Sequence, residues 1–303
     1  MVTGASPLET TSVTPTFSVI IPAYERPTLL RAAIGSVLRQ DFGDFECIVV
    51  DDGGSMELEV PDDPRVRLIR HPRNLGLPSA LNTGLDAAVG EFVTFLDDDD
   101  ELTADRLSLV VPALGRADVV LCWAEADAPP PPANRILEGR VYDTILDTLA
   151  PPKGAVVIAR DRVPRFDARY LALEDLEWWL RVADTLELTT VPQVGYRIHR
   201  HSGRNATNGP VARVQFGEML LRERVDYFGA HRRAAALRWR TIGGIALQLG
   251  DAAAARHALV RSLRAYPTQR AFRTLLKAVR PSRTPLPQLE PGASSAPSGT
   301  SPP

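Results

Sequence analysis

The sequence predicts an α/β fold with a mostly parallel sheet covered by helices. Short apolar segments rich in Val, Ile and Phe alternate with amphipathic segments over the first two thirds of the chain. This alternation is typical of β-α-β units, whose strands are buried on both faces. Polar and acidic residues follow several of the strands directly, and open α/β sheets bind ligands at the carboxyl ends of their strands. We therefore expect a ligand site along that edge.

The 303 residues are 44% hydrophobic and 24% charged, with a formal net charge of −2. The composition is that of a globular protein, and the small net charge gives no case for a nucleic-acid partner. No apolar run approaches the roughly 20 residues of a membrane-spanning helix. Residues 1–16 lack a basic start and an apolar core, so we expect no signal peptide and a cytoplasmic protein. Cys47 and Cys122 lie in apolar runs and indicate buried thiols.

The predicted elements follow from periodicity and from turn residues. Proline suits the first turn of a helix, and apolar residues at helical spacing follow Pro27 and Pro78. Strands are predicted at 17–22, 45–50, 66–69, 92–96, 118–123 and 154–160, with one or two more in 189–199. Helices are predicted to begin near Pro27, near Pro78, after a Thr103 cap, and at Glu174.

The chain is expected to divide into four regions. A flexible N-terminus covers 1–15, the α/β domain covers 16–210, and a helical region covers 211–280. The tail at 281–303 is dominated by Pro, Ser, Gly and Thr and should be disordered.

The helical region carries a basic stretch that has two interpretations. A solvated helical face is one, and contact with an anionic membrane surface, at the inner face of the membrane, is the other. The arginines concerned are Arg222, Arg224, Arg232, Arg233, Arg238 and Arg240.

The most informative segment is Phe92–Glu101, in which five apolar or β-branched residues precede five acidic ones. The first half reads as a buried strand, whereas adjacent carboxylates cannot be buried without compensation. The acidic half is therefore expected at the strand's carboxyl end. Carboxylates there suit a divalent cation that in turn holds an anionic ligand. A solvated acidic loop is the alternative.

Two further pairs of motifs suggest a nucleotide site and a base. Tyr24, after Pro22, and Asp52 follow neighbouring strands, where an aromatic ring and a carboxylate could hold a nucleobase. A packed Tyr and a turn Asp are the alternative. Asp175 precedes Trp178 by one helical turn, so it could act as a general base beside a ring that faces a sugar. A helix-capping carboxylate with core tryptophans is the alternative.

The segment Tyr196–Ser202 contains imidazole and guanidinium groups together. Imidazole is a metal ligand and Arg binds phosphate, so the segment could contribute to a metal and phosphate site. A basic surface turn is the alternative interpretation.

In their order along residues 16–205, these motifs resemble family 2 glycosyltransferases. The resemblance rests on the segments 17–24, 49–55, 74–77, 90–100, 174–181 and 196–202. It implies a GT-A fold and an inverting transfer from a nucleotide-diphosphate sugar to an acceptor hydroxyl. It also implies a Mg²⁺ or Mn²⁺ cofactor and a glycan or lipid-linked acceptor.

The resemblance also implies residue roles. Pro22, Tyr24 and Asp52 would hold the nucleobase. Asp97 would contact the ribose or the metal, and Asp99 would bind the metal, as in the family's Asp-x-Asp pattern. The triplet Asp98–Asp100 fits that pattern too, but strand alternation favours Asp97 with Asp99. Asp98 is also expected among the residues that bind the nucleotide sugar.

On the acceptor side, the resemblance makes Asp175 the base, with Trp178 beside it. His199 would complete the metal shell. Many family members carry an Arg-Asn pair before the acidic strand, with Arg near the donor phosphates, where this chain has Leu81 and Asn82. The phosphate contact is then expected from Arg73 or Arg200.

Two other functions are considered. A sugar-phosphate nucleotidyltransferase should have a glycine-rich loop after the first strand, and residues 23–26 contain no glycine. An inactive GT-A scaffold would bind partners through its C-terminal helices, and the retained Asp97, Asp99 and Asp175 argue against it.

Overall fold

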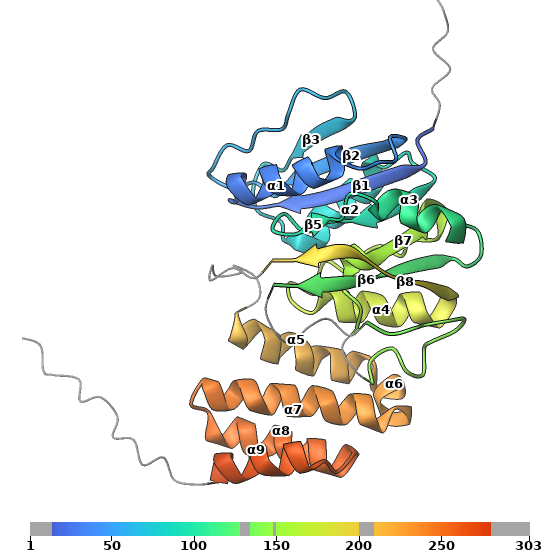
Figure 1. The fold of residues 1–303 in the computed structure, drawn as a ribbon. Coiled ribbons are helices and arrows are strands. Elements are labelled where there is room, and N and C mark those ends of the chain that lie inside the picture. Colours follow the sequence, from blue (N-terminus) through green and yellow to red (C-terminus); the bar gives the residue numbers. More distant parts are fainter. Residues whose placement is uncertain (1–13, 128–133, 148–149, 200–208, 280–303) are drawn as a thin grey trace, which may run out of the picture.

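The computed structural model describes residues 14–127, 134–147, 150–199 and 209–279. Within them, an eight-stranded sheet has the strand order β3-β2-β1-β4-β7-β6-β8-β5. Figure 1 shows this sheet in the upper part of the molecule and a stack of C-terminal helices below it. Most of the predicted N-terminus and all of the predicted tail lie outside the described residues.

The first half of the sheet forms as the sequence predicts. Buried apolar runs make strands, and proline stands in the first turn of each of the first two helices. All the strand pairs among β3, β2, β1 and β4 are parallel. The elements are β1 (Phe17–Ala23), α1 (Pro27–Leu38), β2 (Phe45–Asp51), β3 (Val66–Arg70), α2 (Leu77–Ala87) and β4 (Phe92–Phe95).

The second half of the sheet is mixed. β7 pairs antiparallel with both β4 and β6, while β8 pairs parallel with β6. The predicted α/β fold class is thus confirmed, but with more antiparallel pairing than expected. The elements are β5 (Glu101–Leu102), α3 (Arg106–Val110), β6 (Val119–Ala126), β7 (Val156–Ala159), α4 (Glu174–Thr185) and β8 (Leu188–Ile198).

Two local predictions need correction. Thr103 does not cap α3, because its hydroxyl donates to Asp105 and the residue preceding the helix is Asp105. The segment 189–199 contains a single long strand, β8, which pairs with both β6 and the two-residue β5. The β5 pairing places the end of the acidic run beside Tyr196 and Arg197.

The sheet separates two apolar layers, because successive side chains of a strand point to opposite faces. Ile20 packs with α2 and α4, whereas Val19 and Ile21 pack with α1 and α3. The two cysteines, Cys47 and Cys122, are buried and free, as predicted. The polar residues at the carboxyl ends of the strands therefore lie between two packed apolar layers, one on each face of the sheet.

Helices follow the sheet where the sequence predicts them. Gly217 lets α5 approach α7 closely, since a Cβ there would lie 3.2 Å from the Ile242 side chain. Asp251 caps α8 by accepting from the Ala254 amide. The helices are α5 (Pro210–Glu223), α6 (Val225–Ala230), α7 (Arg232–Gln248), α8 (Ala252–Ala265) and α9 (Gln269–Val279). In the described ranges, none of the helices is long and apolar enough to cross a bilayer.

The predicted basic stretch is not one continuous face. Arg238 is buried, with 8% exposure. Arg224 forms an ion pair with the buried Glu177 at 2.5 Å. Arg232 donates to the Arg264 carbonyl, and Arg233 lies over the Tyr266 ring. Arg224, Arg232 and Arg233 therefore hold the helices in place, whereas Arg222 is exposed.

Candidate active site

An open cleft of about 1060 Å³ lies at the carboxyl ends of β1, β2 and β4. Its far wall includes the N-terminal turn of α4 and the start of α5. The cleft brings together most of the predicted site residues, namely Pro22, Tyr24, Asp52, Asp97, Asp98, Asp99 and Asp175. Asp99 and Asp175, which are far apart in the sequence, thus share one site.

The acidic run forms a turn that follows the carboxyl end of β4, where the sequence predicts it. β4 ends at Phe95, and the Asp100 amide donates to the Asp97 carbonyl at 3.1 Å. The side chains of Asp97 and Asp99 are 30% and 21% exposed, whereas Asp98 and Asp100 are buried. The turn therefore presents Asp97 and Asp99 to the cleft, the pair that the sequence favours.

The two buried carboxylates hold the surrounding loops. Asp98 accepts from the Tyr24 amide at 3.1 Å and from Arg26 at 3.2 Å. Burial raises the pKa of Asp98 to about 6, although the Tyr24 amide and Arg26 oppose that effect. Asp98 therefore fixes the position of the Tyr24 loop, although it also lines the cleft.

Asp100 anchors the opposite side of the turn. It accepts from the Tyr196 hydroxyl and, at 2.9 Å, from the His199 amide. Burial, followed by the charge of Asp97, raises the pKa of Asp100 to about 7. Within the acidic run, Asp97 and Asp99 thus face the cleft, whereas Asp98 and Asp100 mainly hold neighbouring segments through hydrogen bonds.

Two cations that the sequence did not predict neutralise the cleft-facing carboxylates. Arg26 forms an ion pair with Asp99 at 2.6 Å, and Lys153 forms one with Asp97 at 2.6 Å. Burial works against the charge of Lys153, but Asp97 and Glu174 outweigh it and raise the pKa of Lys153. No motif surrounds Lys153 in the sequence, so only the fold reveals its place in the site.

The N-terminus of α4 supplies the predicted base. Leu173, which precedes the helix, has a left-handed conformation with φ of 62°. Asp175 is half-buried and accepts from the Leu176 amide at 2.8 Å. Its neighbour Glu174 is buried, and burial together with the Asp175 charge raises the pKa of Glu174 to about 7. The more accessible carboxylate is therefore Asp175.

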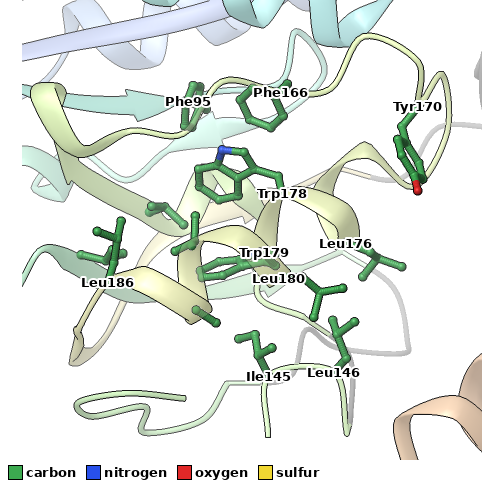
Figure 2. Close-up of a cluster of buried hydrophobic side chains, with 14 of the residues drawn as sticks. Phe95, Ile145, Leu146, Phe166, Tyr170, Leu176, Trp178, Trp179, Leu180 and Leu186 are labelled. Carbon is green, nitrogen blue, oxygen red and sulfur yellow. The ribbon is translucent and has the colours of Figure 1, made fainter. Parts of the chain in front are cut away.

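Trp178 corrects a prediction. Figure 2 shows its ring inside the apolar core, beside Phe95 and Phe166. The side chain is fully buried, and its ring stacks on Phe166 with 5.1 Å between centroids. Its indole N–H donates to the Pro164 carbonyl at 2.8 Å. The ring has no face toward a sugar, so the alternative interpretation, a core tryptophan, is right.

His199 also differs from its predicted place. Its ring contacts Asp127 at 2.6 Å and lies 3.5 Å from Glu101, and it does not line the cleft. In the parts of the chain that the structure describes, no three His, Cys, Asp or Glu side chains are arranged to hold a metal. His199 thus contacts residues beside the ends of β6 and β5, and its role as a metal ligand stays a prediction.

Of the two predicted phosphate contacts, the structure describes only Arg73. Arg73 is exposed and does not line the cleft, while Arg200 lies outside the described residues. Leu81 is buried, and Asn82 bonds to the backbone of Phe166 through both its donor and its acceptor. The described cations that line the cleft are Arg26, Lys153 and Arg213.

At the part of the cleft where the nucleobase is predicted to bind, Asp52 accepts hydrogen bonds from the turn before α2. Its carboxylate accepts from the amides of Leu75 at 2.9 Å and Gly76 at 2.8 Å. It also bonds to the His71 ring at 2.8 Å. Asp52 thereby fixes the turn before α2 in the wall of the cleft, beside Pro22 and Tyr24.

Comparisons with known proteins identify similar sequences. Residues 18–166 match the family model described as Glycosyl transferase family 2. A Campylobacter jejuni protein named GalNAc(5)-diNAcBac-PP-undecaprenol beta-1,3-glucosyltransferase is 43% identical over 104 residues, which are 32% of this chain and 34% of that protein. The Escherichia coli protein WfgD, named UDP-Glc:alpha-D-GlcNAc-diphosphoundecaprenol beta-1,3-glucosyltransferase, is 26% identical over 176 residues, 54% of this chain and 68% of that protein.

A solved structure supports the fold. The S. aureus TarS 1-349 complex with UDP-GlcNAc has a TM-score of 0.61 and 18% identity, covering 87% of this chain and 89% of that one. The match to the Campylobacter protein spans only about a third of that relative's length. The GT-A fold predicted from the sequence is confirmed, and through residues 18–166 the chain belongs to glycosyltransferase family 2.

Proposed function

We propose that this protein transfers a sugar from a nucleotide-diphosphate sugar to an acceptor hydroxyl, with inversion at the anomeric carbon. The observation that carries the proposal is the single cleft lined by Asp97, Asp99 and Asp175. The names of the two curated relatives support a glycan or lipid-linked acceptor, since both refer to undecaprenol-linked saccharides.

The donor is proposed to lie along the strand ends. Pro22, Tyr24 and Asp52 would contact the nucleobase, and Asp97 would contact the ribose. Lys153 is buried beside Asp97, where an ammonium group could bind a donor phosphate. In this role Lys153 replaces the arginine that many family members carry at the position of Leu81.

The acidic turn fits a divalent cation. Asp97 and Asp99 present hard oxygen donors to the cleft, and Mg²⁺ and Mn²⁺ prefer such ligands. Asp99 would hold the ion with Asp97 beside it, and Arg26 would then retain its contact with Asp98. When bound, the ion would stabilise the charge of the leaving nucleotide diphosphate.

Asp175 is proposed to take the proton of the acceptor hydroxyl. The hydroxyl oxygen then attacks the anomeric carbon from the side opposite the leaving group, which departs with the electron pair of the broken bond. This single displacement needs one base and no covalent nucleophile.

A thermal-shift screen of nucleotide-diphosphate sugars, with Mn²⁺ present and absent, tests the proposal. A true donor should raise the melting temperature only when the ion is present. At a concentration of 100 Kd it would stabilise the protein by about 2.7 kcal/mol. The hit should then release nucleoside diphosphate, slowly without an acceptor. If no donor stabilises the protein and none is cleaved, the proposed transfer is wrong.

The same assay distinguishes the proposed transferase from a nucleotidyltransferase and from an inactive scaffold. A sugar-phosphate nucleotidyltransferase would release pyrophosphate from a nucleoside triphosphate, and an inactive scaffold would cleave nothing. The loop Tyr24–Arg26 is held by Asp98 and has no glycine-rich turn that could grip a triphosphate.

We also propose peripheral contact with the inner face of a membrane, through α9. Phe272, Leu276 and Val279 are 53%, 44% and 59% exposed at helical spacing, beside Arg273 and Lys277. An apolar strip with adjacent cations suits an anionic interface.

Vesicle co-sedimentation tests this contact. The protein should bind phosphatidylglycerol vesicles more than phosphatidylcholine vesicles, and less in high salt. The double variant Phe272→Ser/Leu276→Ser should lose binding, whereas Val225→Ser, at another exposed apolar residue, should retain it. Equal binding by all three proteins would exclude α9 as the contact.

A further inference from the structure

Arg238 is a buried cation on the second long helix of the C-terminal stack. The residue is 8% exposed, and within the described residues its Nε atom has no hydrogen-bond partner. Leaving a buried charge without a partner typically costs several kcal/mol. A position that carries this cost is expected to serve a function other than stability.

In the described part of the chain, Asp175 is the carboxylate whose charge acts most strongly on Arg238, and no hydrogen bond joins the two side chains. A small cavity beside Arg238 is lined by Leu173, Thr241, Ile242 and other apolar or small residues, and by a second cation, Arg213. Burial lowers the pKa of Arg238 to about 10, and the charge of Arg213 acts in the same direction while that of Asp175 opposes it. The Arg238 guanidinium therefore remains charged at neutral pH.

The small cavity adjoins the active-site cleft. Leu173 and Arg213 line both of them, and Glu174 and Asp175 follow Leu173 directly in the cleft wall. The two arginines thus lie on the side of the proposed base, whereas the proposed donor contacts come from the ends of β1, β2 and β4 and from Lys153, before β7. The close packing of α5 on α7 at Gly217 holds the two helices in this arrangement.

We propose that Arg213 and Arg238 form a phosphate-binding subsite for the acceptor, so that the acceptor substrate carries a phosphate or diphosphate group near the hydroxyl that reacts. Guanidinium groups bind phosphate oxygens through paired, charge-assisted hydrogen bonds. A bound phosphate would supply the missing partner of Arg238 and relieve its repulsion with Arg213. This inference rests on the proposed function, because it assigns the acceptor side of the same cleft.

Titration calorimetry with inorganic pyrophosphate in EDTA tests the subsite, because chelation removes any metal that could hold pyrophosphate at the acidic turn. The wild type should bind, and Arg238→Met and Arg213→Met should each weaken binding about tenfold or more. Arg222→Met, an exposed arginine of the same helix as Arg213, is the matched control and should bind as the wild type does. If Arg238→Met and Arg213→Met both bind pyrophosphate as tightly as the wild type does, the proposal is wrong.

The melting temperature distinguishes binding from a structural role. Arg238→Met removes a buried charge whose Nε atom has no hydrogen-bond partner among the described residues, and the variant should melt at the same or a higher temperature than the wild type. A lower melting temperature would count against the proposal. Arg213 is exposed, so Arg213→Met should fold even if Arg238→Met does not. The pyrophosphate affinity of Arg213→Met therefore tests the subsite independently of Arg238.

Two probes identify the source of the phosphate. Farnesyl diphosphate represents a lipid-linked acceptor, and glycerol 3-phosphate represents a polyol-phosphate chain. Preferential binding of either one, lost in Arg238→Met, supports the subsite and names its source. Donor-induced thermal shifts should persist in both variants. If no nucleotide-diphosphate sugar raises the melting temperature of the wild type, the proposed function is wrong, but the measured pyrophosphate binding still stands.

Discussion

Replacing Asp175 by Asn is expected to lower turnover by about 10²- to 10⁴-fold while donor affinity stays nearly unchanged. Asn keeps the size and the hydrogen bond to the Leu176 amide but cannot accept the proton of the acceptor hydroxyl. Since Asp175 lies away from the proposed donor contacts, the loss should appear in kcat. Steady-state kinetics with the donor from the screen, together with donor calorimetry, gives both quantities.

Two comparisons make the Asp175 result specific. Asp86→Asn applies the same change to an exposed carboxylate that pairs with Arg165 outside the cleft, and should leave kcat unchanged. The pH–rate profile of Asp175→Asn should lose the acidic limb that reports protonation of the base. Full turnover in Asp175→Asn would remove this residue from the mechanism.

Replacing Asp99 by Ala is expected to abolish the part of donor binding that depends on Mn²⁺. Asp99 is exposed to the cleft and is the proposed ligand, and Arg26 keeps Asp98 as a partner when Asp99 is removed. The fold should therefore survive the substitution. Donor calorimetry with Mn²⁺ and with EDTA should give equal, weak binding in the variant.

Asp98→Asn is the informative contrast to Asp99→Ala. Asp98 is buried and holds the Tyr24 amide and Arg26, so its replacement should lower the melting temperature and leave a response to Mn²⁺. If wild-type donor binding does not change with EDTA, Lys153 and Arg26 hold the diphosphate without a metal. That outcome would refute the proposed ion and retain the cleft as the donor site.

The sequence predicted the elements and much of the cleft, because those signals are local. Buried strands such as β1 and β2 appear as short segments dominated by apolar residues, and a proline marks the first turn of α1. Carboxyl ends of neighbouring parallel strands meet at one edge, so Tyr24, Asp52 and Asp99 had to lie near one another. The acidic run could not be buried as a whole.

The tertiary structure decided which side chains face the cleft and which charges meet there. Helical spacing put Trp178 one turn from Asp175, but the packing of α4 against Phe95 and Phe166 buried it. Lys153 lines the cleft although no motif surrounds it in the sequence, and Arg238 lies beside the cleft although it belongs to the predicted basic stretch. Contacts between distant segments leave no periodic signal in the sequence. By itself, the sequence determined the strand ends and their carboxylates. Only long-range packing determined the cations opposite them.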